Sequence, residues 1–398
     1  MDFEPSERSR LILEQLERFM AEYVYPNEPV ARRQVEASGD PHHFPEILEE
    51  LRARAKALGL WNLFLSDEAY GAGLTNAEYA PLCEIMGRSE IAPLVFNCAA
   101  PDTGNMEIRA EFGTPEQKQR WLQPLLEGEI RSCFSMTEPE VSGADPTGLR
   151  CRAVRDGDHY VIDGHKWYTT GAQGAAFAIA MAVTDPDAPP HARASMLIVP
   201  TDTPGFQLIR SVSVMGETRG GGHCEIRYEN CRVPASNLLG PEHGGFAIAQ
   251  ARLGPGRIHH CMRCIGAAER AFELMCRHAN ARVAFGSPLA DKQFVQDWVA
   301  SSRMEIHQAR LLALHAAWTM DVRGKRAARH EISMLKVIAP NVAMRVLDRA
   351  IQCLGALGMS DDTPIASMWR NVRGLRIADG PDEVHKMVIA RRELARFS

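Results

Sequence analysis

The hydrophobic period of this chain changes twice, and this change constrains the fold more than any other feature. Up to about residue 130, apolar residues such as Leu16 and Phe19 recur at helical spacing. From about 131 to 240, short alternating or fully apolar runs, such as 177–183, lie between turns. From about 241, long helical patterns such as 294–299 return. We therefore expect an α+β protein with a helical domain (1–130), a central antiparallel β domain (131–240) and a helical bundle (241–398).

Local signals agree with this division. In the segment 113–117, Thr114 is followed by Pro115 and, three residues after the threonine, by Gln117, which predicts a capped helix start. The Asp-Gly pairs 156–157 and 163–164 predict tight turns on both sides of a strand at 159–162. The glycines at 220–222 predict a flexible turn rather than a phosphate-binding loop, because no helix start follows them.

Composition excludes several classes of function. The 398 residues are 45% hydrophobic and 24% charged, and the net charge of -5 comes from dispersed residues. We therefore expect no nucleic-acid partner. No apolar run approaches the roughly 20 residues of a spanning helix, so we expect no membrane span.

The chain ends and the cysteines indicate a cytoplasmic location. The first seven residues are acidic where a targeting peptide is basic, and the last residues form no peroxisomal signal. Ten cysteines are scattered without a disulfide framework, as expected of reduced thiols. Cys261 and Cys264 form a C-x-x-C inside a helical pattern, and we interpret them as buried helical residues rather than metal ligands.

Three segments carry candidate chemistry. The chain has no G-x-G-x-x-G, Walker or G-x-S-x-G motif, which argues against a Rossmann dehydrogenase, a kinase and an α/β-hydrolase. Segment 132–139 (SCFSMTEP) can present hydroxyls and backbone amides to a flat polar ring, or be an edge strand stopped by proline. Segment 166–171 (KWYTTG) repeats the aromatic and hydroxyl pattern.

The third segment is 375–385 (LRIADGPDEVH), an acidic loop between two helical patterns. Gly380 and Pro381 break the helix, so Asp379 should project from a turn, as suits a general base. Asp382 has the spacing of a helix cap, and spacing alone favours capping over chemistry. Both interpretations remain open at this point.

Together, these segments resemble the acyl-CoA dehydrogenase family over nearly the whole chain. The resemblance also includes 113–122 and 282–286. It is greatest for the subgroup of family members ten and eleven, whose marks here are 101–107 (PDTGNME), 253–263 (LGPGRIHHCMR) and 378–385 (ADGPDEVH). The resemblance implies the family fold, with an N-terminal helical domain, a central β domain and a C-terminal four-helix bundle.

The resemblance implies FAD as the cofactor, bound between the β domain and the C-terminal helices. Arg282 and Gln293 would reach FAD across a subunit interface, which requires a homodimer or homotetramer. An arginine fork suits a pyrophosphate, although an arginine at a helix end is more often a partner of the helix dipole. The full set of FAD contacts that it implies is Phe134, Met136, Thr137, Trp167, Tyr168, Thr169, Thr170, Arg282, Gln293, Gln352, Gly355, Gly358, Pro381, Asp382 and Glu383.

The resemblance further implies α,β-dehydrogenation of an acyl-CoA, with Asp379 as the base and flavin N5 as the hydride acceptor. An electron-transfer flavoprotein is the implied acceptor of the electrons. The implied substrate contacts are Ser142, Gly256, Arg257, Ile258, His259 and Gly380. Most of the family has glutamate where this chain has Asp379, and the loop 138–145 is one residue longer than the usual pattern. Nitroalkane-oxidase-like oxidation of another carbon acid, or a non-catalytic role for the fold, is the alternative.

Overall fold

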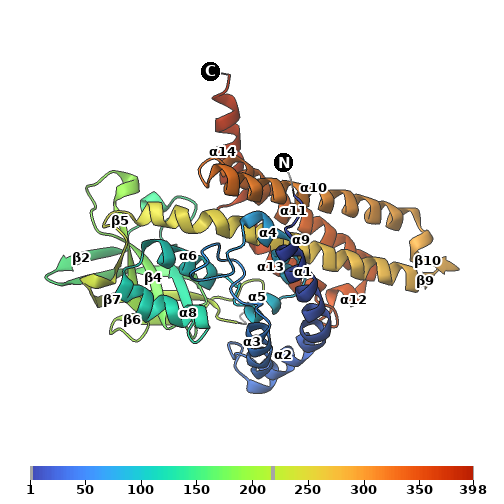
Figure 1. The fold of residues 1–398 in the computed structure, drawn as a ribbon, viewed down its shortest axis with the longest axis horizontal. Coiled ribbons are helices and arrows are strands. Elements are labelled where there is room, and N and C mark those ends of the chain that lie inside the picture. Colours follow the sequence, from blue (N-terminus) through green and yellow to red (C-terminus); the bar gives the residue numbers. More distant parts are fainter. Residues whose placement is uncertain (1–2, 217–219, 398) are drawn as a thin grey trace. The chain divides into compact units, whose positions relative to one another are not determined.

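The computed structural model describes residues 3–216 and 220–397 (Figure 1). Its chain divides into two compact units. Unit 1 comprises Met1–Glu28, Ser66–Pro93 and Gly254–Ser398. Unit 2 comprises Pro29–Leu65 and Leu94–Leu253. The three-domain boundaries expected from the sequence stay a prediction.

Unit 1 is built almost entirely from helices. Its main elements are α1 (Glu7–Phe19), a π-helical turn (Met20–Val24), α4 (Asn76–Gly87), most of α9 (Gly245–Ala281), α10 (Gln293–Arg323), α11 (Arg329–Leu354), α12 (Ala356–Met359), α13 (Ile365–Gly374) and α14 (Asp382–Leu394). Helices α9 and α10 are joined by the short strands β9 (Val283–Ala284) and β10 (Ser287–Pro288) and a 3₁₀ turn (Leu289–Asp291). Helix α2 (Tyr25–Ser38) begins in unit 1 and continues into unit 2.

Helices α4 and α9 approach each other unusually closely. A Cβ atom built on Gly266 would lie 1.9 Å from the backbone oxygen of Glu84, and one on Gly87 would lie 2.4 Å from the Cα of Arg263. Only glycine permits such backbone contact. The contact is reinforced by Arg310 of α10, whose guanidinium donates to both carboxylate oxygens of Glu84 at 2.9 and 2.7 Å.

Unit 2 combines short helices with an eight-stranded sheet. The helices are α3 (Glu46–Ala57), α6 (Asp102–Phe112), α7 (Pro115–Gln117), a π-helical turn (Lys118–Leu122) and α8 (Gln123–Glu127), while α5 (Ala92–Val95) crosses the boundary between the units. The strands are β1 (Ser132–Ser135), β2 (Arg152–Asp156), β3 (His159–Thr170), β4 (Phe177–Val183), β5 (Ala194–Pro200), β6 (Phe206–Ser211), β7 (His223–Pro234) and β8 (Leu238–Leu239). Short 3₁₀ turns lie at Pro146–Gly148, Pro190–Ala192 and Ala235–Asn237.

The strand order is β6-β7-β3-β2-β4-β5-β8, with β1 also paired to β4. Most neighbouring strands are antiparallel, as the turn-rich sequence predicts. Two pairings with β4 are parallel: β1, where Ser132 lies opposite Phe177, and a single contact of β2. All seven residues of β4 are buried because neighbouring strands flank it and the core covers it.

The first predicted turn is confirmed and the second is wrong. Gly157 takes a φ of 60° in the β2–β3 hairpin. Gly164 instead lies inside β3, at a register shift against β7. A Cβ atom on Gly164 would lie 2.5 Å from the Cβ of Cys151, so this glycine serves a β-bulge and a close contact rather than a turn.

The predicted helix start at Thr114 is confirmed. The hydroxyl of Thr114 accepts from the backbone N–H of Gln117, and the side chain of Gln117 accepts from the backbone N–H of Thr114, both at 3.3 Å. The Gln117 amide also donates to the backbone oxygens of Ser236 and Leu238 at 2.7 and 2.8 Å, which ties α7 to the edge of the sheet. Among the helices in the described ranges, we find none with both the length and the apolarity needed to cross a membrane.

Candidate active site

Asp379 lies on the loop between α13 and α14, as the Gly-Pro break in the sequence predicts. Its φ is +57°, a left-handed conformation that costs energy for a residue with a side chain, although aspartate tolerates it better than most. Gly380 follows with a φ of +103°. The side chain of Asp379 is 22% exposed. The loop therefore directs a partly buried carboxylate from a tight, strained turn.

Backbone oxygens of this loop accept hydrogen bonds from three helices. The guanidinium of Arg257, on α9, donates to the backbone oxygen of Asp379 at 2.8 Å. The ammonium of Lys336, on α11, donates to the backbone oxygens of Leu375 and Gly380, the latter at 3.4 Å. The imidazole of His385, on α14, lies 3.4 Å from the backbone oxygen of Asp379. Surrounding helices therefore fix the main chain that carries Asp379.

Asp382 does not cap α14, so that interpretation of the sequence is wrong. It is the first residue of the helix, and Pro381 occupies the cap position without a side-chain hydrogen bond. The Asp382 carboxylate instead accepts from Arg376 at 2.9 Å and from Asn341 at 2.8 Å. It is buried, whereas Pro381 is half-buried and Glu383 is exposed. Asp382 thus joins the loop to α11.

Burial shapes the charge of the groups around Asp379. It lowers the pKa of Arg257, and the Asp379 carboxylate opposes that effect. Burial, together with the positive charges of Arg257 and Lys336, lowers the pKa of His385 to about 4. His385 is therefore neutral near pH 7, while Lys336 is only 1% exposed.

The implied substrate residues on α9 have different environments. Gly256 and Arg257 are half-buried, and a Cβ atom on Gly256 would meet open space. The side chains of Ile258 and His259 are 0% and 2% exposed. The ring of His259 packs edge-on against Tyr79 with centroids 4.9 Å apart, and burial lowers its pKa to about 3. The structure therefore favours Gly256 and Arg257 over the next two residues for contact with a ligand.

In unit 2, the two segments with hydroxyl and aromatic residues lie side by side. The hydroxyl of Thr137 donates to the backbone oxygen of Trp167 at 2.7 Å, and the Trp167 N–H donates to the backbone oxygen of Thr137 at 3.1 Å. A fully buried ion pair, Lys166 with Glu138 at 2.8 Å, joins the same segments. Lys166 also donates to the backbone oxygen of Met136 at 2.8 Å.

The side chains on these two segments differ in exposure. Tyr168 and Thr170 are exposed, and Phe134, Met136, Thr137 and Trp167 are half-buried. The side chain of Thr169 is buried, with its hydroxyl 3.4 Å from that of Ser135. Ser142 is exposed on the longer loop, where the adjacent Gly143 lies against Thr137. The exposed aromatic faces and hydroxyls suit a flat ring with polar edges.

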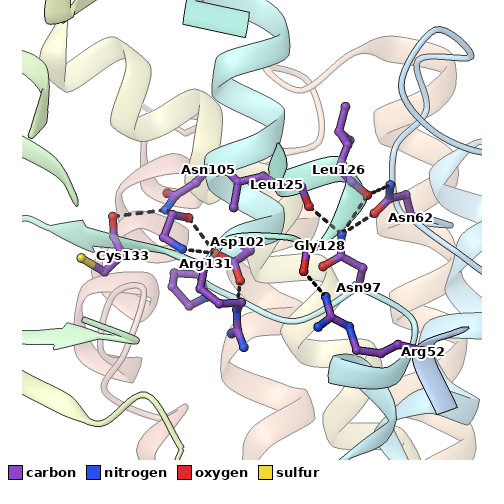
Figure 2. Close-up of polar contacts among 12 residues, drawn as sticks. Arg52, Asn62, Asn97, Asp102, Asn105, Leu125, Leu126, Gly128, Arg131 and Cys133 are labelled. Atoms are coloured by element: carbon purple, nitrogen blue, oxygen red, sulfur yellow. Dashed lines mark hydrogen bonds and ion pairs between the residues drawn. The ribbon is translucent and has the colours of Figure 1, made fainter. Parts of the chain in front are cut away.

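Two residues of segment 101–107, which the sequence marked only through the family resemblance, hold the start of β1 (Figure 2). They are Asp102 and Asn105 of α6. The Asp102 carboxylate, on α6, accepts from the backbone N–H and hydroxyl of Ser132 at 2.8 and 2.6 Å, and pairs with Arg131. The Asn105 amide donates to the Ser132 hydroxyl at 2.9 Å and to the backbone oxygen of Cys133 at 3.2 Å. The signal for this role is that the polar residues Asp102 and Asn105 lie among the mostly buried residues of α6.

The same helix places Phe134. The guanidinium of Arg252 donates to the side-chain oxygen of Asn105 at 3.0 Å and lies 4.1 Å from the centroid of the Phe134 ring. Gly104 leaves room for it, because a Cβ atom there would lie 2.9 Å from the Arg252 side chain. Segment 101–107 thus orients the strand that carries Phe134.

The remaining implied cofactor residues lie at helix ends of unit 1. Arg282 directly follows α9 and Gln293 begins α10, and both are exposed. Gln352 is exposed in the last turn of α11, and Gly355 ends that helix with a φ of +64°. Gly358 is buried, and a Cβ atom on it would lie 2.8 Å from the Cα of Ile351, so it serves helix packing. Gly355 offers an exposed backbone that a ligand can approach closely.

Comparison with known proteins identifies the family. The N-terminal, middle and C-terminal domains of acyl-CoA dehydrogenase match residues 6–129, 133–231 and 243–394. The chain belongs to the acyl-CoA dehydrogenase family. Both the resemblance and the expected fold class are thereby confirmed. Members of this family are FAD-dependent oxidoreductases, and the aromatic, hydroxyl and glycine positions described above fit such a cofactor.

Several relatives are similar along the whole chain. FadE2 of Mycobacterium tuberculosis, named as an acyl-CoA dehydrogenase, is 54% identical, covering 100% of this chain and 98% of its own. Acyl-CoA dehydrogenase family member 10 of Mus musculus is 51% identical, and member 11 of Gallus gallus is 47% identical, each over 98% of this chain. The chain spans only 37% and 51% of the lengths of these two animal proteins.

Solved structures share the fold. An acyl-CoA dehydrogenase from Mycobacterium abscessus has a TM-score of 0.96 and 47% identity, covering 99% of this chain and 100% of its own. Butyryl-CoA dehydrogenase from Megasphaera elsdenii has a TM-score of 0.85 and 29% identity, covering 99% of this chain and 100% of its own. A chain described as an electron transferring flavoprotein of Acidaminococcus fermentans has a TM-score of 0.85 and 28% identity, again over these shares.

Proposed function

We propose that this chain dehydrogenates an acyl-CoA thioester to the trans-2-enoyl-CoA, with Asp379 as the base that takes the α-proton. The observation that carries the proposal is the Asp379 loop itself. Cationic side chains of Arg257 and Lys336 fix its main chain, while the carboxylate stays 22% exposed. A base must be held in place yet be reachable, and this arrangement provides both conditions.

The chemistry divides between the protein and its cofactor. FAD, when bound, supplies the acceptor for the β-hydrogen, which leaves as hydride to flavin N5. A carboxylate oxygen of Asp379 receives the α-proton. The backbone N–H of Asp379 donates to the thioester oxygen as negative charge develops there. The left-handed turn and the Arg257 contact fix the backbone from which the Asp379 side chain, one methylene shorter than glutamate, projects.

We further propose that the implied FAD residues other than Gly358 hold the cofactor and that the protein is a homodimer or homotetramer. Arg257 and the end of α9 at Ala281 are separated by 24 residues, or about 36 Å along the helix. Arg282 is thus remote from the Asp379 of its own chain, which supports its role, with Gln293, in the site of a second copy. The substrate contacts proposed at Ser142, Gly256, Arg257 and Gly380 complete the assignment.

The electron acceptor and the location are proposals too. An electron-transfer flavoprotein is the proposed acceptor, which the similarity to the Acidaminococcus chain supports. A cytoplasmic location is supported by the ten cysteines, which all lie in the described residues and form no disulfide. Cys261 and Cys264 are buried in α9, as the sequence predicts.

The test is an anaerobic titration of the yellow holoenzyme with straight and branched acyl-CoAs, followed by loss of flavin absorbance. We expect at least one acyl-CoA to bleach the flavin. Asp379→Asn should slow bleaching by roughly 100-fold or more, the typical contribution of a general base. Asp362→Asn, at an exposed loop position, is the matched control and should bleach at the wild-type rate.

Three results would contradict the proposal. Bleaching of Asp379→Asn at the wild-type rate would remove Asp379 as the base. Oxygen consumption with nitroalkanes, without bleaching by any acyl-CoA, would instead support nitroalkane oxidation. A colourless protein that does not take up FAD would support a non-catalytic role.

A further inference from the structure

His260 is a second titratable group beside Asp379. It lies on α9 one turn after Arg257. Its Nε2 atom is 3.5 Å from Oδ2 of Asp379, and both side chains are 22% exposed. At this distance the two groups are in ion-pair contact, beyond the roughly 2.7–3.2 Å of an N–H···O hydrogen bond. Contacts of catalytic groups are often long without substrate and shorten in the complex.

A second arginine sets the tautomer of His260. The guanidinium of Arg263, one turn further along α9, has Nη2 3.1 Å from Nδ1 of His260. A guanidinium only donates, so Nδ1 must accept. The proton of the neutral imidazole is therefore on Nε2, the atom that faces Asp379.

Arg263 is itself held in place by the contact between α4 and α9. Its Cα lies 2.4 Å from the position that a Cβ of Gly87 would take, and its Nη1 donates to the sulfur of Cys83, on α4, at 3.8 Å. A chain of contacts therefore leads from α4 through Arg263 and His260 to the carboxylate of Asp379.

Other charged groups face the loop from the surrounding helices, and they contact its backbone oxygens. Arg257, Lys336 and His385 all contact backbone oxygens of the loop. Burial raises the pKa of the Cys261 thiol, which keeps it neutral. His260 differs because it faces the carboxylate that takes the proton.

We propose that His260 is a positioning residue for the base, donating its Nε2–H to Asp379 Oδ2 in the orientation that Arg263 imposes. This inference rests on the proposed function. The hydrogen bond stabilises the carboxylate over the carboxylic acid, so it lowers the pH above which the base is active. It also restricts rotation of the carboxylate and leaves Oδ1 toward the substrate.

Two substitutions test the role. His260→Phe removes the donor, whereas His260→Gln keeps an N–H close to the position of Nε2. We expect the acidic limb of the pH profile for flavin reduction by acyl-CoA to rise by about 0.5–1 pH unit in His260→Phe, the effect of one hydrogen bond. The limb of His260→Gln should stay near the wild type. His307→Phe, at an exposed position of α10, is the control and should not move the limb.

A second readout does not depend on turnover. Infrared difference spectra of the holoenzyme between acidic and neutral pH, with the band assigned through Asp379→Asn, report protonation of this carboxyl group directly. His260→Phe should protonate it at higher pH than the wild type. An unchanged limb and band in a folded His260→Phe, with Asp379→Asn inactive, would refute the role of His260 alone. If Asp379→Asn kept the wild-type rate, the proposed function itself would fail.

Discussion

The contact between α4 and α9 makes Gly266→Ala a sharp test of the packing argument. A Cβ atom there would lie 1.9 Å from the backbone oxygen of Glu84, 2.9 Å from the backbone carbon of Gly87 and 3.0 Å from the backbone nitrogen of Arg88. All three atoms belong to backbone, so no side-chain rotation relieves the clash. Ordinary contact begins near 3.4 Å, so the helices must separate locally by about 1.5 Å (3.4 minus 1.9).

Two opposing effects decide the magnitude. Alanine is about 1 kcal/mol more favourable than glycine inside a helix. Overpacking costs typically about 1–3 kcal/mol, and occasionally more. Separation also disturbs the ion pair of Glu84 with Arg310 and the neighbouring pair of Arg310 with Glu269. With the upper end of the overpacking cost, the gain in helix propensity and about 1 kcal/mol for the disturbed ion pairs, we expect a net destabilisation of about 3 kcal/mol. For a unit of about 200 residues, this lowers the Tm by about 6–12 °C.

The assay is thermal unfolding followed by circular dichroism, with Gly254→Ala as the matched control. Gly254 lies on the same helix, and a Cβ atom there would meet no atom within 4 Å. Its substitution should leave the Tm unchanged or raise it by about 2–4 °C, in line with helix propensity. If Gly266→Ala melted at or above the wild-type temperature, alongside Gly254→Ala, the close helix contact would be refuted.

Two further predictions concern the loop and its surroundings. Lys336→Met should lower the rate of flavin reduction by about tenfold or more while the flavin stays bound, because losing about 1.4 kcal/mol of positioning corresponds to that factor. The measurement is stopped-flow flavin reduction. An unchanged rate would show that the Leu375 and Gly380 contacts do not position the base. The pKa of His385 is about 4 in the folded protein, against an ordinary value near 6.5. As the pH falls, the unfolded chain therefore binds the proton first. Folding stability is then lost between pH 6.5 and pH 4, by about 3 kcal/mol in total. His385→Gln should therefore lose less Tm than the wild type over this range, and parallel curves of Tm against pH would contradict the assignment.

Features that depend on neighbours in sequence were predictable. The Thr114 cap, the hairpin at Gly157 and the position of Asp379 on a loop each follow from a few consecutive residues. The role of Gly164 did not follow, because it depends on Cys151 across the sheet. The spacing of Asp382 is that of a cap, but its carboxylate binds Asn341, which lies 41 residues earlier.

The site shows the same limit. Lys336 has no local signature, because its partners lie 39 and 44 residues further along the chain. A lysine in an amphipathic helix normally predicts a solvent-exposed side chain, yet here it is 1% exposed. Asp102 and Asn105 were recognised only as family marks, and their role became visible when α6 and β1 were seen together. Physical roles that join two segments need the tertiary structure.

Packing and chemistry in unit 1 are joined through α9. Gly87 and Gly266 set the spacing between α4 and α9, and Arg263, which lies against Gly87, orients His260 toward Asp379. A substitution that forces the helices apart should therefore change more than stability. Below its melting temperature, folded Gly266→Ala should show an acidic limb displaced in the direction of His260→Phe, because the same hydrogen bond is lengthened. A Gly266→Ala protein with a lower Tm and a wild-type limb would show that the spacing of the helices and the protonation of the base are independent.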